Sequence, residues 1–234
     1  MSLPRAALLR ELGLWPQWRL KAPSSAAPPP MSAGESRAQT IARMDWDELT
    51  RAILQCDACP LHLTRTQGVP GVGDRNADWL IVGEAPGAEE DAKGEPFVGQ
   101  AGKLLDAMLA AIDLARGRNV YIANVLKSRP PGNRNPAPKE IAACLPYLQR
   151  QIELIQPRII FAVGRFAAQA LLDTEEPIGR LRGRVHHYRD IPVVVSYHPA
   201  YLLRNPAEKA KSWEDLCLAR RVVAQGAQDA GADP

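Results

Sequence analysis

Residues 79–87 read WLIVGEAPG, an apolar run that ends in a turn containing Gly83, Pro86 and Gly87. A short apolar run bounded by such residues is typical of a buried strand in a parallel sheet. Similar runs recur as VYIANV (residues 120–125), RIIFAVG (158–164) and IPVVVSYHP (191–199). Helical spacing or helix-start residues occupy the intervals, over 102–114, 138–155, 165–172 and 212–224. The alternation predicts an α/β fold in which helices cover both faces of a short, mainly parallel, four-stranded sheet.

The polar motifs of this sequence fall where the predicted strands end. GEAPG follows the first strand, Asn124 lies late in the second, and His198 follows the fourth. In open parallel sheets, ligands bind at the carboxyl ends of the strands. We therefore expect these three groups to meet in one site.

The overall composition sets only broad limits. The chain has 234 residues, of which 24% are charged, and its net charge of +3 is too small to identify a nucleic-acid partner without local basic patches. No apolar stretch is long enough for a membrane helix, so no membrane association is expected. Arg10 and Glu11 interrupt the N-terminal apolar run, which argues against a secretory signal. Four cysteines are too few for a disulfide scaffold, so we expect a cytoplasmic protein.

The ends of the chain differ in composition from its middle. Residues 1–22 form an N-terminal extension in which Trp15 and Trp18 suit a peptide that docks to a partner, although an extension resting on the domain explains them as well. Residues 23–36 are a linker rich in Pro, Ser and Ala. The globular domain is predicted over residues 45–224, and residues 225–234 are predicted to be a disordered tail.

The segment GEAPGAEEDAKGEPFVGQAG, residues 83–102, concentrates carboxylates in a turn. So many like charges are unsuited to a phosphate-binding loop. They suit a site that orients a water molecule and stabilises a positively charged sugar as a leaving group departs. Phe97, between Pro96 and Gly99, is an aromatic residue in a loop and could stack on a base. The alternative is a solvated acidic surface.

The segment NVLKSRPPGNRNPAP, residues 124–138, is a stiff basic loop. Lys127, Arg129 and Arg134 are placed to contact phosphates. An amide inside an apolar strand is costly without a partner, so Asn124 could read the edge of a base with its acceptor and two donors. Hydrogen bonds to the neighbouring backbone are the structural alternative for Asn124.

The segment HPAYLLRN, residues 198–205, contains a histidine, two adjacent leucines and an arginine. His198 could donate to a departing group as negative charge builds on it, or it could be a structural histidine. Leu202 or Leu203 could fill the space left by a flipped base, next to Arg204.

The cysteines are spaced as a CxxC pair, Cys56 and Cys59, followed by Cys144 and Cys217. This pattern is compatible with zinc, redox chemistry or an iron–sulfur cluster. Cys217 is most simply a buried residue of the last helix.

Together the three long motifs resemble those of the family 4, iron–sulfur type uracil-DNA glycosylases, over residues 49–221. The resemblance implies a three-layer α/β/α sandwich that flips uracil out of DNA and hydrolyses its N-glycosidic bond, leaving an abasic site. It places Glu84 and Asp91 in the motif that activates water and stabilises the sugar. It also implies that His198 assists departure of the base, and that uracil is bound by Gly83, Ala85, Phe97 and Asn124.

The resemblance also implies a [4Fe–4S] cluster, for which the chain has an incomplete ligand set. Cys56, Cys59 and Cys144 match family positions, but Ser128 stands where the third cysteine belongs. A hydroxyl is a poorer cluster ligand than a thiolate, so we expect a cluster that is labile or absent.

The resemblance favours a monomeric hydrolase whose partner is uracil-containing DNA. The PPGNRNP form lacks the inserted basic loop with which a sister group attaches covalently to DNA, so turnover is expected. Two alternatives stay open: a glycosylase for other deaminated or mismatched bases, and a catalytically silent DNA-binding repair module.

Overall fold

The computed structural model describes residues 36–230, with side chains described through Gly226. The predicted N-terminal extension, its two tryptophans and all of the linker except Ser36 lie outside the described residues. Within the described part of the chain, no helix combines the length and the apolar character needed to cross a membrane.

The strands described between residues 36 and 230 form one six-stranded sheet in the order β1-β3-β2-β4-β6-β5. They are β1 (Val72–Gly73), β2 (Trp79–Gly83), β3 (Val120–Asn124), β4 (Ile159–Val163), β5 (Val185–Tyr188) and β6 (Ile191–Ser196). The four central strands run parallel and are the four that the sequence predicts. The predicted total of four is wrong, because β1 and β5 add an antiparallel edge strand on each side.

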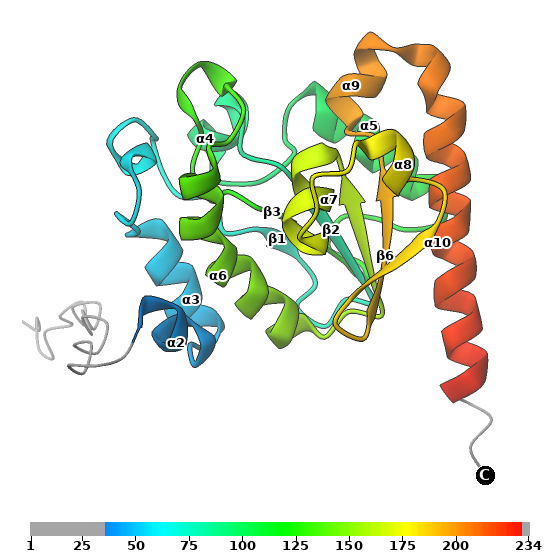
Figure 1. The fold of residues 1–234 in the computed structure, drawn as a ribbon, viewed down its shortest axis with the longest axis horizontal. Coiled ribbons are helices and arrows are strands. Elements are labelled where there is room, and N and C mark those ends of the chain that lie inside the picture. The colour runs from blue at the N-terminus through cyan, green and yellow to red at the C-terminus, as the bar shows by residue number, and fades with distance from the viewer. Residues whose placement is uncertain (1–35, 231–234) are drawn as a thin grey trace, which may run out of the picture. The chain divides into compact units, whose positions relative to one another are not determined.

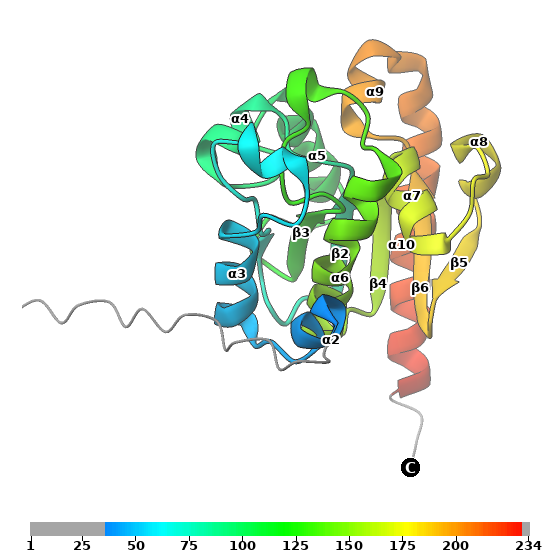
Figure 2. The same ribbon diagram turned by 60° about the vertical axis from the view of Figure 1, so that its left-hand side comes forward.

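Helices cover both faces of this sheet, as Figures 1 and 2 show. Alternate residues of β2 point to opposite faces: Leu80 and Val82 pack with α6 and α7, whereas Trp79 and Ile81 pack with α5 and α10. All five residues of β2 are buried, which explains why the strand is a continuous apolar run. The longer helices are α5 (Gln100–Ala110), α6 (Pro138–Ile155), α7 (Arg165–Leu172) and α10 (Lys209–Ala230).

The shorter elements connect the layers and build the loops. They are α2 (Arg37–Ala42), α3 (Trp46–Leu54), η1 (Pro60–Leu63), α4 (Ala88–Lys93), η2 (Pro131–Asn133), α8 (Ile178–Leu181), α9 (Pro199–Arg204) and η3 (Pro206–Glu208). Helices α2 and α3 pack on α6 through a small core of Ile41, Leu49, Ile53 and Tyr147. Asp45 caps α3 by accepting hydrogen bonds from the backbone N–H groups of Asp47 and Glu48.

The last helix is longer than predicted at both ends. It starts at Lys209, so Ser212 lies inside the helix and does not cap it. The Ser212 hydroxyl instead accepts a hydrogen bond from the hydroxyl of Ser196 (2.9 Å). It continues to Ala230, so the prediction of a disordered tail from residue 225 is wrong as far as residue 230. Alanines are strong helix formers, which allows the polar end of this helix to continue beyond its buried part.

The strand register brings the ends of the central strands to one edge. Gly83 pairs with Asn124, Val82 with Ala162, and Val163 with Ser196. The residues that follow these pairs therefore leave the sheet side by side, as the sequence predicts for the polar motifs.

Candidate active site

A cavity of about 560 Å³ opens at the carboxyl edge of the sheet. Its lining includes seven of the residues predicted from the sequence: Glu84, Ala85, Phe97, Asn124, Arg134, His198 and Arg204. The predicted meeting of the GEAPG turn, Asn124 and His198 in one site is thus what the structure shows. The chemical role of each residue stays a prediction.

Phe97 is held in the cavity wall by an unusual backbone conformation. Its φ of 55° lies in the left-handed region, and its side chain is only 5% exposed. The guanidinium of Arg116 donates to the carbonyls of Pro96 (2.8 Å) and Phe97 (2.7 Å). A Cβ atom at Gly102 would collide with the Phe97 carbonyl, so only glycine permits this approach. The Phe97 ring stacks on the His198 ring at 5.4 Å between centroids.

Asn124 presents an unpaired acceptor to the same region. Its Oδ1 atom is buried and has no hydrogen-bond partner among the described residues. Hydrogen bonding of this oxygen to the neighbouring backbone, the structural alternative, is therefore not observed. An unpaired buried acceptor costs about 1–3 kcal/mol, which a ligand N–H would recover. A Cβ atom at Gly83 would collide with this oxygen and with the Phe97 ring, so Gly83 keeps the space in front of the amide open.

His198 is fixed as a neutral donor. It caps α9, and its Nδ1 accepts a hydrogen bond from the backbone N–H of Ala200 (3.1 Å). Because Nδ1 is an acceptor, the proton of the neutral ring lies on Nε2. Burial, together with the nearby positive charge of Arg204, lowers the pKa of His198 to about 4, and the negative charge of Glu90 opposes the shift. The ring is therefore uncharged at neutral pH.

Glu84 and Glu90 share the cavity but have different surroundings. Burial raises the pKa of Glu84, and the positive charge of Arg165 opposes that rise. Glu90 accepts hydrogen bonds from the backbone N–H groups of Gly87 (3.0 Å), Val98 (2.9 Å) and Gly99 (3.1 Å). Glu90 therefore shapes the acidic loop, whereas Glu84 is available for chemistry.

Asp91 does not line the cavity, contrary to its predicted catalytic placement. It is only 3% exposed, and both of its carboxylate oxygens accept from the backbone N–H of Thr66 (2.9 and 3.0 Å). Its position three residues into α4 turns it away from the site and toward the loop before β1.

Two predicted DNA contacts are wrong because the side chains are buried. Lys127 is 1% exposed, and its Nζ donates to the Asn124 carbonyl (2.7 Å) and to Oε1 of Gln151 (2.6 Å). Burial also lowers the pKa of Lys127 to about 7. Leu202 is 1% exposed and faces a separate apolar cavity between α5, α9 and α10. Lys127 thus supports Asn124 from within the core.

The other predicted contacts remain at the surface. Arg129 donates to Oδ1 of Asn133 (2.7 Å), and Arg134 forms two hydrogen bonds to the carboxylate of Glu140 (2.9 and 2.6 Å). Leu203 is 44% exposed on α9, next to Arg204 of the cavity wall. Of these side chains, Arg134 and Arg204 line the cavity, and the charge of Arg134 is paired with that of Glu140.

The structure adds cavity residues that the sequence argument passed over. Arg165, Phe166 and Tyr201 line the cavity with Glu90. Arg165 is the first residue of α7, directly after Gly164 at the end of β4, and its guanidinium lies 4.5 Å from the Phe166 ring centroid. The rule that strand ends carry the site would have indicated Arg165, but no motif marked this strand end.

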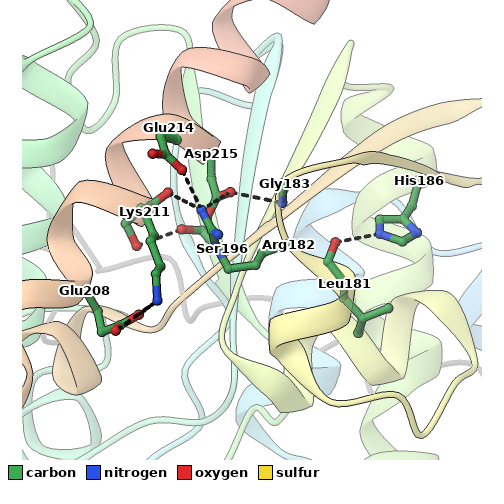
Figure 3. Close-up of polar contacts among 10 residues, drawn as sticks. Leu181, Arg182, Gly183, His186, Ser196, Glu208, Lys211, Glu214 and Asp215 are labelled. Atoms are coloured by element: carbon green, nitrogen blue, oxygen red, sulfur yellow. Dashed lines mark hydrogen bonds and ion pairs between the residues drawn. The ribbon is translucent and has the colours of Figure 1, made fainter.

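A buried ion pair braces the segment that carries His198 (Figure 3). Asp215 of α10 is fully buried and accepts from Nε (3.1 Å) and Nη2 (3.0 Å) of Arg182 and from the backbone N–H of Gly183 (3.1 Å). The Arg182 guanidinium also lies 5.7 Å from the Tyr197 ring, which packs on Tyr201 of the cavity wall at 5.0 Å. Helix α10 is thereby connected to the residues on either side of His198.

The residues expected to hold a cluster do not form a metal site. Within residues 36–230, no three His, Cys, Asp or Glu side chains lie close enough together to bind one metal ion. Cys59 packs against the apolar cluster that contains Cys144, and Ser128 accepts a hydrogen bond from Arg65 (2.7 Å). The structure thus does not bring the expected ligand set together.

The Uracil DNA glycosylase superfamily model matches residues 70–217, so the chain belongs to this superfamily. It is 51% identical over 168 residues to the type-4 uracil-DNA glycosylase of Archaeoglobus fulgidus, covering 68% of this chain and 84% of that protein. The type-4 enzyme of Pyrobaculum aerophilum is 43% identical, with 75% and 93% covered. The type-5 enzyme of the same organism is only 31% identical, with 67% and 83% covered. Within the superfamily, this chain is a member of the type-4 group, whose members typically carry an iron–sulfur cluster.

The buried ion pair between Arg182 and Asp215 gives a prediction about stability. Arg182→Met should lower the free energy of unfolding by about 3 kcal/mol, because it leaves the Asp215 carboxylate buried without its cation. Urea unfolding at neutral pH measures this loss. Arg184→Met is the matched control, since Arg184 pairs with Glu176 at the surface (3.3 Å) and should change stability by less than about 0.5 kcal/mol. Equal effects of the two substitutions would show that the buried pair has no special contribution.

Proposed function

We propose that the cavity at the carboxyl edge receives a uracil flipped out of DNA, and that the surrounding side chains hydrolyse its bond to deoxyribose. The chain is a uracil-DNA glycosylase by family, and uracil-containing DNA is its substrate by that homology. The observation that carries the assignment of the site is the buried, unpaired Oδ1 of Asn124, which shares a cavity with the neutral His198 and the Phe97 ring.

Base recognition rests on complementary hydrogen-bonding groups. Uracil N3–H is a donor and matches the unpaired Oδ1 of Asn124, while uracil O4 accepts from the amide nitrogen. Cytosine presents the opposite pattern, with an unprotonated N3 and an amino donor at C4. The main chain of Asn124 is held in place by the buried Lys127, whose Nζ donates to the Asn124 carbonyl. Phe97 offers an aromatic surface for the base, and Gly83 leaves room for it.

The bond to the sugar breaks in a dissociative step. The electron pair of the bond between C1′ and N1 leaves with the base, so negative charge develops on uracil, including O2. His198 donates from Nε2 to O2, and this hydrogen bond strengthens as the charge grows. With a pKa of about 4, His198 stays neutral and acts as a hydrogen-bond donor rather than as an acid. The departing anion takes its proton from solvent.

Glu84 completes the reaction on the sugar side. As a carboxylate it stabilises the cationic sugar, and it accepts a proton from the water whose oxygen bonds to C1′. The products are uracil and an abasic site. Arg165, whose charge opposes the rise in the pKa of Glu84, helps to keep this carboxylate ionised.

The surface around the cavity fits a DNA strand. Arg129, Arg134 and Arg204 supply positive charge for phosphates, and the exposed Leu203 replaces Leu202 as the side chain that fills the vacated base stack. Base extrusion costs a few kcal/mol, which contacts in the cavity and with phosphates offset. We propose that one chain is sufficient for this arrangement, since all the named groups come from the same domain.

The purified protein should convert uracil-containing oligonucleotides to alkali-labile products without added metal or nucleotide. The assay is a denaturing gel after alkali, with matched oligonucleotides that contain hypoxanthine, a G·T mismatch or cytosine in place of uracil. A higher excision rate for uracil than for the other bases supports the proposal. Preference for another base would support the broader glycosylase alternative, and no excision at enzyme concentrations equal to the substrate would support the silent repair module.

Asn124→Asp should reduce the preference for uracil over cytosine by about tenfold or more, because a carboxylate loses the donor to O4 and accepts from the cytosine amino group. The ratio of single-turnover rates on the two bases measures this change. Arg129→Gln is a control, since it lowers phosphate contact without touching the amide. An unchanged ratio in the Asn124 variant would show that this residue does not read the base.

His198→Ala should slow the single-turnover rate by about a hundredfold and change the Kd for uracil-containing DNA by less than about threefold. The reason is that the contact is strongest in the transition state. Rate and Kd are measured on the same duplex, the latter with a non-hydrolysable uracil nucleotide. A comparable loss in both would assign His198 a structural role.

The excision rate should fall as pH decreases through the raised pKa of Glu84, because the carboxylate must be ionised to accept a proton. Arg165→Met should move this acidic limb to higher pH, and Glu84→Gln should remove it while lowering the rate. Other charged or titratable groups that line the cavity are Glu90, Arg134, His198 and Arg204. His198, with a pKa of about 4, titrates below the limb. An identical profile in the Arg165 variant would contradict this assignment.

A further inference from the structure

Ser128 stands at the position where type-4 family members have a cluster-binding cysteine. Its hydroxyl is hydrogen-bonded to an arginine. Ser128 is only 4% exposed, and its Oγ accepts a hydrogen bond from Nη1 of Arg65 at 2.7 Å. Nη2 of the same guanidinium donates to the carbonyls of Leu54 (2.8 Å) and Cys56 (2.9 Å). Arg65 therefore connects the end of α3 and the CxxC segment to the turn after β3.

The three cysteines are also arranged in a way that does not suit a cluster. The Sγ atom of Cys56 accepts from Nη2 of Arg37 at 3.6 Å. Cys144 is buried in an apolar cluster with Leu61 and Leu126, and Cys59 packs against that cluster. Each cysteine thus has its own surroundings, and among residues 36–230 no three His, Cys, Asp or Glu side chains converge on one point where a metal ion could bind.

We propose that this protein holds no iron–sulfur cluster, and that the Arg65–Ser128 hydrogen bond joins the two segments that a cluster would otherwise connect. A hydroxyl is a hard and weakly acidic ligand, poorly suited to iron. As a hydrogen-bond acceptor for a guanidinium, however, it is well matched, since Arg offers several donors in a fixed planar geometry. The packing of Cys59 with Cys144 adds an apolar connection between the CxxC segment and α6.

This connection reaches the cavity through a short series of hydrogen bonds. Val69, in the segment that follows Arg65, donates from its backbone N–H to the Lys127 carbonyl (2.8 Å). Lys127 precedes Ser128 and donates from Nζ to the carbonyl of Asn124. Arg65 is therefore a positioning residue, because it fixes the turn whose lysine supports the Asn124 backbone.

The first measurement is the iron and acid-labile sulfide content of the full chain after anaerobic purification, together with its visible absorption. We expect well under one iron per chain and no broad absorption near 400 nm, both before and after incubation with ferrous iron, sulfide and a reductant. A content near four irons per chain, or absorption that appears on reconstitution, would overturn the proposal. Neither measurement depends on whether the cavity excises uracil.

The second measurement is a double-mutant cycle on the melting temperature. Arg65→Met should lower the Tm by about 5 °C or more, and Ser128→Ala by about 2 °C. Adding Ser128→Ala to Arg65→Met should cause almost no further loss, since the hydroxyl has then already lost its donor. Arg75→Met is the control, because Arg75 pairs with Asp47 at the surface (3.7 Å) and should leave the Tm unchanged. Additive losses would show that Arg65 and Ser128 do not act as a pair.

The positioning role has a separate readout. Arg65→Lys keeps the charge but not the planar donor set, so it should restore the Tm only in part. Both Arg65 variants should reduce the ratio of uracil to cytosine excision rates more than Arg75→Met does, because they loosen the turn that supports Asn124. An unchanged ratio alongside a lowered Tm would limit Arg65 to a structural role and overturn its assignment as a positioning residue.

Discussion

The parallel register of the four central strands is the constraint on which the rest of the structure depends. Gly83 pairs with Asn124, Val82 with Ala162, and Val163 with Ser196, so the chain leaves four neighbouring strands at the same level. Continuous apolar runs buried on both faces hold this register, since a shift by one residue would turn every side chain to the opposite face. The cavity, its amide and its histidine all follow from that alignment.

Burial within the cavity favours the uncharged forms of two groups at once. It raises the pKa of Glu84 and lowers the pKa of His198. Uncharged groups suit the binding of a neutral base. In the proposed reaction, the His198 donor and the Glu84 carboxylate then face the charges that develop on the base and on the sugar. The positive charge of Arg165 opposes the rise in the pKa of Glu84, whereas Glu90 accepts three backbone hydrogen bonds within the acidic loop. The acidic loop is thus partly structural and partly functional, which its composition alone does not reveal.

The sequence predicts the central strands and seven residues of the cavity lining because both depend on local signals: apolar runs and polar residues at their ends. It fails where burial depends on tertiary packing. Lys127 has the composition of a phosphate contact, but the turn after β3 directs it into the core toward Gln151. The edge strands β1 and β5 are too short or too polar to stand out, with side chains that are at most half-buried. Leu202 and Leu203 are adjacent and identical in type, so only the direction of α9 decides which is exposed.

Departures from the usual rules of folding gather around Asn124, the residue that we propose reads the base. Asn124 has an unpaired buried oxygen, Lys127 is a fully buried lysine, and Phe97 has a positive φ. Each is unfavourable alone, and such departures are expected where function requires them. Each is also supported by a specific neighbour: Gln151 accepts from the lysine, and Arg116 holds the Phe97 carbonyl. Asn124 Oδ1 has no hydrogen-bond partner among the described residues, so this group of residues leaves one acceptor unpaired, and it belongs to a residue that lines the cavity.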